Sequence, residues 1–488
     1  MHIVIIGAYG SAGVAVADRL VGHIGEEIDR LTLVDDGTPG GGLCILRGCM
    51  PSKEVISAAA HRYQARSDDR LDGRAHDLDL DAVISKKDQH TGNFARHRRS
   101  HVEELAETEG VEFVQGTARF ADDDVVELYE GETLEADSHG QFEGDAEPSR
   151  TITADYTAVC TGSVVNVPEI EGIDEVPYRD SAELLDTTQL PDSGIVMGFG
   201  YVGMEMAPYL AEAGVDLTVI EHDERPLDQA HPDFGDVAME IYREEFDITI
   251  LTCTRERKLE ATARGGVRLI CESQAGSERV VEAEELFLFT GRRPNVQGLG
   301  LENTSVTADG DYVRDTMQAN AAENLFFAGD VNGKEPLLHI AKEQGELAGQ
   351  NILAHAGGRP VETFGFTPHQ VMFAGAGVYP YARVGHTAET ARREPDTDPI
   401  VVRRRAEDDG VFKVKEVGRG LAELVVDRDG TVIGYQGLHY HADVMAKTLQ
   451  LAVEMGLDVR EIPDRAFHPT TPEILDGLVR EAKAELPG

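Results

Sequence analysis

Two cysteines in the segment GGLCILRGCMPSK carry the clearest chemical signal in the sequence. Cys44 and Cys49 are five residues apart, so on a short turn they are close enough to form and break one disulfide. Such a pair can exchange electrons with a flavin or nucleotide bound beside it. The segment therefore indicates redox chemistry.

A metal site and a purely structural role are the alternatives for these cysteines. A zinc site needs a second pair of ligands at similar spacing, and Cys160, Cys253 and Cys271 are isolated, with no CxxC or HxxxH beside them. We therefore expect no metal. The chain begins directly with HIVIIGA and shows no basic segment or cleavage motif. This start predicts a reducing, cytoplasmic location, where paired cysteines are more often catalytic than structural.

The composition predicts a folded protein with an acidic surface. At 488 residues the chain is long enough for about three or four domains. The 89 acidic and 45 basic residues give a net charge of −44, while hydrophobic residues still make up 41%. The acidic excess is spread along the chain, which is typical of salt-adapted, halophilic proteins and disfavours nucleic-acid binding. No apolar stretch approaches the ~20 residues of a membrane span.

The first of two glycine motifs begins the chain. HIVIIGAYGSAGVAVADRL followed by LTLVDD predicts a buried strand, a glycine turn, a helix and a second strand that ends at Asp35. The glycines are Gly7, Gly10 and Gly13, and Ala8 stands where a GxGxxG register ending at Gly13 requires a glycine. Asp35 lies 22 residues beyond Gly13, where a carboxylate can accept a ribose hydroxyl.

The second motif, GIVMGFGYVGMEMAPYLAEAGVDLTVIE, keeps the GxGxxG spacing at Gly198, Gly200 and Gly203. Glu221 ends its second strand, where a carboxylate hydrogen-bonds a free 2′-hydroxyl and repels a 2′-phosphate. This residue favours NAD over NADP, and the nearby Arg225 keeps the preference moderate. A plain turn between strand and helix is the alternative for either motif, but two copies imply two dinucleotide sites.

The rest of the chain is divided by pattern. A helix is expected over about 82–109 and a strand over 111–120, and the polar span 129–150 is interpreted as a solvated hairpin without chemistry. From about 359 onward, alternating strands precede helices, which is typical of a separate α+β domain.

With these pieces in order, the chain resembles the class I pyridine nucleotide–disulfide oxidoreductases, a family that includes dihydrolipoamide dehydrogenase, glutathione reductase and mercuric reductase. Five motifs occur in the family's order: CxxxxC with PSK, CTGS at 160–163, the second glycine motif ending in Glu205, AGD at 328–330 and HPTTPE at 468–473. The resemblance implies an FAD-dependent homodimer of the α/β class, with two Rossmann-like dinucleotide domains and a C-terminal α+β dimerisation domain. The expected segments are 1–160 and 284–358 for FAD, 161–283 for NAD(P), and 359–488 for dimerisation.

The same resemblance implies roles for the redox residues. Cys49 corresponds to the thiol that faces the flavin, and Cys44 to the interchange thiol that attacks substrate. Lys53 and Glu205 match the family's ion pair beside the reactive nitrogen of the flavin.

Cofactor and proton-transfer residues follow in the same way. Asp330 matches the residue that holds the ribityl and phosphate region of FAD, and Gly329 the close backbone approach beside it. The resemblance also implies that Asp35 binds the adenosine ribose, that Gly162 of CTGS contacts the cofactor, and that His468 and Glu473 form the acid–base dyad. In that dyad the imidazole shuttles the thiol proton and the carboxylate orients the ring.

Three departures from the family pattern leave the substrate open. GGLCILRGCM replaces the usual GGTCLNVGCI, GFTPHQVMFAGAGVYPYARVG is longer than the usual FTDPEVASVG stretch, and RAFHPTTPE lacks the second histidine of HAHPT. The leading expectation is electron transfer from dihydrolipoamide, free or on a lipoyl domain, to NAD, because Glu221 favours that acceptor. The alternatives are an NAD(P)H-dependent reductase of small disulfides such as bis-γ-glutamylcystine, a mercuric reductase, and a quinone or dye diaphorase. Mercuric reductase is disfavoured because no cysteine follows Cys271.

Overall fold

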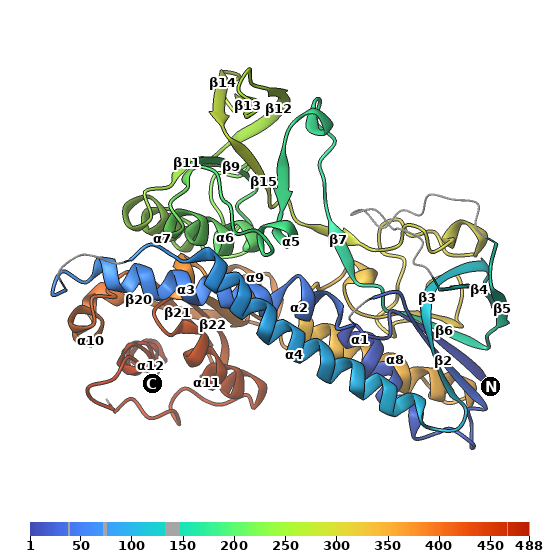
Figure 1. Cartoon of the computed structure of the whole chain (residues 1–488). Helices are drawn as coiled ribbons and strands as arrows, with labels where there is room; N and C mark the ends of the chain where they lie inside the picture. The colour runs from blue at the N-terminus through green and yellow to red at the C-terminus, as the bar shows by residue number, and fades with distance from the viewer. Residues whose placement is uncertain (38–39, 72–75, 132–146, 466, 488) are drawn as a thin grey trace. The chain divides into compact units, whose positions relative to one another are not determined.

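The structure is a computed structural model that describes residues 1–37, 40–71, 76–131, 147–465 and 467–487. The chain divides into two compact units, each built from three stretches of sequence. Figure 1 labels many of their helices and strands. Unit 1 comprises Met1–Pro51, Ser85–Asn166 and Gly291–Gly365, and unit 2 comprises Ser52–Ile84, Val167–Thr290 and Phe366–Gly488. The four segment boundaries expected from the sequence stay a prediction. Most of the expected hairpin at 129–150 falls on residues 132–146, which lie outside the described residues.

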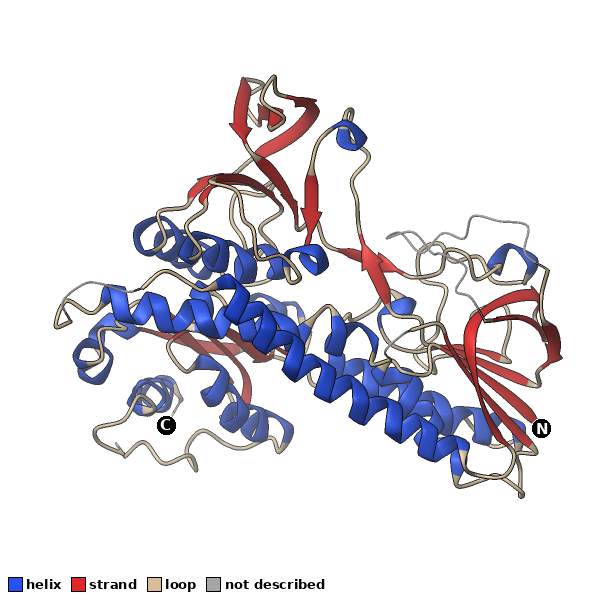
Figure 2. Cartoon of the chain, viewed as in Figure 1, coloured by secondary structure: helices blue, strands red, loops and turns tan. Residues whose placement is uncertain are grey.

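Unit 1 is built on a seven-stranded sheet. Its strands are β1 (His2–Ile6), β2 (Arg30–Asp35), β3 (Val111–Asp122), β4 (Val125–Glu130), β5 (Arg150–Thr153), β6 (Tyr156–Val159) and β17 (Leu325–Phe327). They lie in the order β17-β6-β1-β2-β3-β4-β5, parallel as far as β3 and antiparallel beyond it. Ile3, Val4 and Ile5 are fully buried, as expected of a parallel strand covered on both faces. Helices α1 (Ser11–Val21) and α8 (Leu338–Ala356) pack together in this unit (Figure 2).

Further elements of unit 1 are a pair of short strands and three helices, two of which cross a boundary with unit 2. Strand β7 (Ser163–Val165) pairs with β16 (Arg292–Pro294). Helix α2 (Gly42–Leu46) precedes α3 (Cys49–Ser67), and α4 (Leu80–Ala106) is the helix expected over 82–109. Both α3 and α4 continue across a boundary between the two units.

Unit 2 contains a second parallel sheet and a small antiparallel one. The parallel sheet has the order β11-β10-β9-β15-β8, and the antiparallel sheet has the order β12-β13-β14. Their elements are β8 (Tyr178–Asp180), β9 (Ser193–Met197), β10 (Asp216–Ile220), β11 (Thr249–Leu251), β12 (Thr254–Ala261), β13 (Val267–Ser273), β14 (Glu278–Ala283) and β15 (Glu285–Leu288), with helices α5 (Ser181–Leu184), α6 (Tyr201–Glu212) and α7 (Pro232–Glu245). The glycine motif at 198–203 therefore lies between β9 and α6.

The C-terminal part of unit 2 is an antiparallel sheet in the order β18-β19-β22-β21-β20. Its elements are β18 (His369–Met372), β19 (Tyr381–Gly385), β20 (Pro399–Arg405), β21 (Gly420–Asp427) and β22 (Val432–His439), with helices α9 (Ala388–Arg393), α10 (Gly410–Val414), α11 (Ala442–Glu454) and α12 (Glu473–Glu485). Phe234 of α7 and Tyr381 of β19 are buried with ring centroids 6.1 Å apart. The expected fold class, two Rossmann-like halves and a C-terminal α+β domain, is confirmed.

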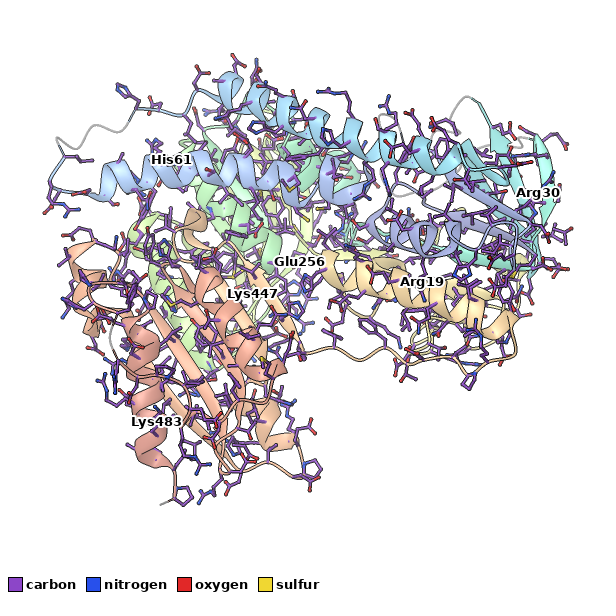
Figure 3. The ribbon with its side chains drawn as sticks, turned by 90° about the horizontal axis from the view of Figure 1, so that it is seen from below. Arg19, Arg30, His61, Glu256, Lys447 and Lys483 are labelled. Carbon is purple, nitrogen blue, oxygen red and sulfur yellow. The ribbon has the colours of Figure 1, made fainter. Side chains whose placement is uncertain are left out.

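Charged side chains project from elements throughout the described chain, for example Arg19 on α1, Lys447 on α11 and Lys483 on α12 (Figure 3). Glu423 is a buried exception, and its carboxylate is paired with a cation: it is fully buried and accepts from Arg403 Nε at 2.6 Å. Within the described part of the chain, no helix has both the length and the apolar character needed to cross a membrane.

Candidate active site

The two cysteines lie on helices and not on a short turn, so that prediction is wrong. Cys44 is in the middle of α2, a single helical turn, and Cys49 is the first residue of α3. Both are free thiols in this structure, with Cys44 half-buried and Cys49 exposed. The end of one helix and the start of the next still bring the two side chains together, and they are hydrogen-bonded.

The environment of Cys44 holds its proton in place. The hydrogen bond with Cys49 and then burial raise the pKa of the Cys44 thiol, and the positive charge of Arg98 opposes them only in part. Arg98 itself is anchored by donating from Nη1 to the carbonyl oxygen of Tyr9 at 2.8 Å. At neutral pH the thiol of Cys44 needs a base before it can act as a nucleophile.

The first glycine motif forms a tight turn that leads into α1. Gly7 has φ +90°, and a Cβ there would lie 2.5 Å from the carbonyl oxygen of Cys160, so only glycine fits. A Cβ at Gly13 would collide with the carbonyl oxygen of Gly7. Gly10 is the N-cap of α1 and offers no side chain to the first amides of that helix. Free amides and the helix dipole together suit a bound phosphate.

The second motif repeats these contacts one residue shorter. Gly198 has φ +93° and a Cβ there would lie 2.5 Å from the carbonyl oxygen of Phe289, while Gly203 packs on the carbonyl oxygen of Gly198. Gly200 is the N-cap of α6. Gly198 and Gly203 therefore correspond to the first and last glycines of the first motif, which are six rather than five residues apart.

Two carboxylates identify the extra residue. Asp35 accepts from the backbone amides of Tyr9 and Gly37, both at 2.8 Å. Glu221 accepts from the amides of Phe199 and Asp223, both at 2.9 Å. Tyr9 and Phe199 each precede an N-cap glycine, so the additional residue of the first motif is Ala8. The departure from GxGxxG is thus an insertion, and each carboxylate ties its glycine loop to the end of the neighbouring strand.

Burial affects Asp35 more than its hydrogen bonds do. Desolvation raises the pKa of the Asp35 carboxyl to about 6, although the two backbone amides favour the ionised form. A hydrogen-bond donor from a ligand, such as a ribose hydroxyl, would further stabilise this carboxylate.

The CTGS and AGD motifs meet in unit 1. Asp330 Oδ2 accepts from Ser163 Oγ at 2.7 Å, and Arg292 Nε donates to that Oγ at 2.8 Å. Gly329 precedes Asp330, and a Cβ there would lie 3.3 Å from the Cβ of Ala12 at the start of α1. Gly162 lies beside Ser163. Residues from three motifs therefore surround the carboxyl edge of the unit 1 sheet, where parallel α/β sheets bind dinucleotides.

In unit 2, Lys53 of α3 and Glu205 of α6 form an ion pair. Lys53 Nζ donates to Glu205 Oε2 at 2.6 Å, and both side chains are partly buried, with 31% and 15% of their surfaces exposed. Glu205 Oε1 accepts from the backbone amide of Phe373 at 2.9 Å. Sequence analysis did not identify Phe373, and the unusual length of its segment was the only signal that could have drawn attention to it.

The basic residues near Glu221 are already paired. Arg225 Nε donates to Asp236 at 2.6 Å, and its Nη1 lies 2.9 Å from Glu224. His222 hydrogen-bonds to Glu256. These contacts occupy the side chains that would otherwise neutralise a 2′-phosphate.

His468 and Glu473 are hydrogen-bonded at the start of α12. His468 Nδ1 donates to Glu473 Oε1 at 2.9 Å, and the amide of Thr470 donates to the same oxygen at 3.1 Å. The imidazole is 72% exposed and the carboxylate 20% exposed. The carboxylate orients the ring, and Nε2 can exchange protons with a group outside the dyad.

The site residues thus form groups in two units. Unit 1 holds the dithiol and the first dinucleotide loop with Asp35, Gly162, Gly329 and Asp330, and unit 2 holds the second loop with Glu221, the ion pair and the dyad. The dithiol supplies redox chemistry, the loops suit dinucleotides, and the dyad supplies a base. The roles of the individual residues stay predictions.

Comparisons with known proteins agree on one family. Residues 1–345 match the model of the pyridine nucleotide-disulphide oxidoreductases, and residues 377–478 match the model of their dimerisation domain. The chain is 29% identical to a dihydrolipoyl dehydrogenase of Halobacterium salinarum, with 96% of this chain and 94% of the relative covered. It is also 29% identical to a mercuric reductase of Streptomyces lividans, with 94% and 91% covered.

Solved structures share the fold at lower identity. The HOCl-induced flavoprotein disulfide reductase RclA of Escherichia coli superposes with a TM-score of 0.79 at 22% identity, over 98% of this chain and 99% of that one. LpdA of Mycobacterium tuberculosis gives a TM-score of 0.79 at 22% identity, over 99% of each chain.

Proposed function

The chain belongs to the pyridine nucleotide-disulphide oxidoreductases, which use FAD and NAD(P)H, and on that premise we propose that it oxidises dihydrolipoamide and reduces NAD. The hydrogen-bonded thiols of Cys44 and Cys49 carry the proposal. As a disulfide the pair can accept two electrons from a substrate dithiol, and as a dithiol it can donate two electrons to a substrate disulfide. The names of the haloarchaeal relatives support the choice of substrate. The surroundings of Glu221 support the choice of NAD.

The proposed reaction starts with Cys44 and Cys49 joined as a disulfide. A substrate thiolate attacks Cys44 Sγ, which forms a mixed disulfide and releases Cys49 as a thiolate. The other thiolate of the same substrate molecule then attacks the substrate sulfur of that mixed disulfide, which releases Cys44 and closes the product disulfide. The imidazole of His468, held in orientation by Glu473, takes the proton of the first substrate thiol and releases it to solvent. It then takes the proton of the second thiol and returns it to Cys44 as that sulfur leaves. Bound FAD supplies the route by which the two electrons of the dithiol reach NAD.

The chain's own residues would hold that cofactor. The amides at the start of α1, Asp35, Gly329 and Asp330 fit its adenosine and phosphate parts, and Lys53 with Glu205 would lie beside its reactive ring. Removal of the Cys44 proton is the demanding step on the return half of the cycle, because burial and the Cys49 hydrogen bond raise its pKa.

A homodimer is part of the proposal. The chain carries the family's dimerisation domain, and α11 exposes Val444, Leu451 and Met455, with Met455 directly after its end. These residues lie on one face of the helix, at spacings of seven and four. In the proposed dimer, His468 of one subunit serves the cysteines of the other.

Mixed dimers test this arrangement. A His468→Ala subunit paired with a Cys44→Ser subunit should restore one working site per dimer. Alone, the Cys44→Ser variant should be inactive in disulfide exchange and the His468→Ala variant strongly slowed. No recovery in a verified heterodimer would show that each site is built within one chain.

The alternative is reduction of a low-molecular-weight disulfide by NAD(P)H, which the single histidine of RAFHPTTPE favours. Steady-state assays in high salt with dihydrolipoamide and NAD, and with small disulfides and NADH or NADPH, distinguish the two. The proposal requires the higher kcat/KM for dihydrolipoamide with NAD. Activity with dyes alone, unchanged in Cys44→Ser, would instead indicate a diaphorase.

A further inference from the structure

Phe373 touches both members of the Lys53–Glu205 ion pair. Its backbone amide donates to Glu205 Oε1 at 2.9 Å, while Glu205 Oε2 accepts from Lys53 at 2.6 Å. The ammonium of Lys53 also lies 4.7 Å from the centroid of the Phe373 ring. One residue therefore fixes the carboxylate through its backbone and faces the ammonium with its ring.

The segment after Phe373 is tied to the helices that carry the pair. The amide of Gly375 donates to the hydroxyl of Tyr242 at 3.2 Å, and that hydroxyl donates to the carbonyl oxygen of Met204, the neighbour of Glu205. A Cβ at Gly377 would lie 3.0 Å from Cγ2 of Ile56, which follows Lys53 by three residues on α3. This segment is the one that is longer than the family's usual stretch. Its anchoring to α3 and α6 holds Phe373 against the ion pair.

The contact between ammonium and ring has a defined physical effect. A cation within ~6 Å of an aromatic centroid is attracted to the negative face of the ring, more strongly where water is partly excluded. The Lys53 side chain is only 31% exposed. A lysine side chain has several rotatable bonds, and the attraction to the ring restricts them. Without the ring, the ammonium would keep the carboxylate as its partner but would occupy a wider range of positions.

We propose that Phe373 is a positioning residue that holds the Lys53 ammonium at one place beside the flavin and so raises the flavin's reduction potential. A positive charge fixed near the flavin favours the reduced form, which gains negative charge. The inference rests on the proposed function, because it assumes that Lys53 acts on the flavin.

The test measures the flavin midpoint potential of the purified FAD-loaded enzyme by equilibration with a reference dye. Phe373→Leu keeps the backbone amide and removes the ring, and it should lower the ratio of reduced to oxidised flavin at a fixed potential by about three- to tenfold, or ~15–30 mV for two electrons. Phe373→Tyr keeps the ring and should match the wild type. Phe412→Leu is the control for loss of a buried ring in the same unit, since Phe412 packs on His439 instead.

Fluorinated phenylalanine at position 373 provides a second measurement if Phe373→Leu does not fold. Successive fluorines weaken the negative face of the ring at nearly constant shape, so the potential should fall stepwise with fluorine number. A flat series would overturn the inference and leave a packing role only.

Lys53→Met separates this inference from the proposed function. A shifted potential in Lys53→Met with an unchanged potential in Phe373→Leu would overturn the role of Phe373 and leave the ion pair's role intact. An unchanged potential in both variants would contradict the placement of the ion pair beside the flavin, and the inference with it.

Discussion

Replacing Glu221 by glutamine should weaken the discrimination against NADPH. Both oxygens of this carboxylate are held by backbone amides at 2.9 Å, so its negative charge stays at the strand end, where the proposed NAD would place its ribose. Arg225 and His222 are engaged by acidic residues and do not offset that charge. A 2′-phosphate would therefore meet a fixed carboxylate.

The size of the effect follows from Coulomb's law. Two unit charges ~4 Å apart repel by about 1 kcal/mol in water and about 4 kcal/mol in a medium resembling a protein surface. Glu221 is partly buried, so we expect a discrimination of about 1–3 kcal/mol, which is a ratio of about 5 to 150 in kcat/KM. Glu221→Gln removes the charge, but its side-chain NH2 group replaces one of the two oxygens that accept from backbone amides, so one hydrogen bond is lost. That lost hydrogen bond affects both nucleotides, so the ratio isolates the charge.

The assay is kcat/KM for NADH and for NADPH in the direction of disulfide reduction, at low and at molar salt. The wild type should prefer NADH, Glu221→Gln should reduce the ratio, and Glu221→Asp, which keeps the charge, should reduce it less. The preference should also shrink in molar salt, where charges are screened beyond ~3 Å. A wild type that prefers NADPH, or a ratio unchanged in Glu221→Gln, would refute this reasoning and favour the small-disulfide reductase.

Three further predictions concern the dyad, the first loop and the surface. His468→Ala should slow disulfide exchange by ~100-fold or more while NADH still reduces the flavin, because the imidazole serves only the thiol protons; rapid-mixing of each half-reaction checks this, and equal slowing of both would contradict it. In FAD-free protein, the pKa of the Asp35 carboxyl is about 6 in the folded state and ~4 in the unfolded chain, so ionisation of Asp35 favours unfolding. As the pH rises from 4 to 7, the free energy of unfolding of the wild type should therefore fall by about 2–3 kcal/mol relative to that of Asp35→Asn. Urea titrations at each pH measure the difference, and a constant difference would refute the burial argument. With a net charge of −44, the melting temperature should rise with KCl because screening reduces self-repulsion, and a melting temperature that falls or stays level would show that repulsion does not limit stability.

Much of the fold was predictable because local patterns determine it. Two units of strand, glycine turn and helix begin at β1 and β9, and both lie where expected. Buried apolar runs predict their strands, and the glycine spacing predicts their tight turns. Which residue of the first loop is the extra one could not be determined from the sequence. Only the hydrogen bonds of Asp35 and Glu221 show that Ala8 is the inserted residue.

Other features depend on contacts between distant residues. The short turn expected at the cysteines is two helices, since Cys44 lies in α2 and Cys49 begins α3. Phe373 is 168 residues from Glu205 in sequence, and no motif connects them. The unusual length of its segment was visible, but the contact it makes was not.

The behaviour of the two cysteines on reduction tests the central claim most directly. Limited anaerobic reduction of the purified enzyme with dihydrolipoamide should produce a long-wavelength absorption band from a Cys49 thiolate beside oxidised flavin. Cys44→Ser should keep the ability to show this band, and Cys49→Ser should lose it, because only one sulfur is expected to face the flavin. Loss of the band in both variants to the same extent, or a purified protein without flavin, would contradict electron transfer through the Cys44–Cys49 pair.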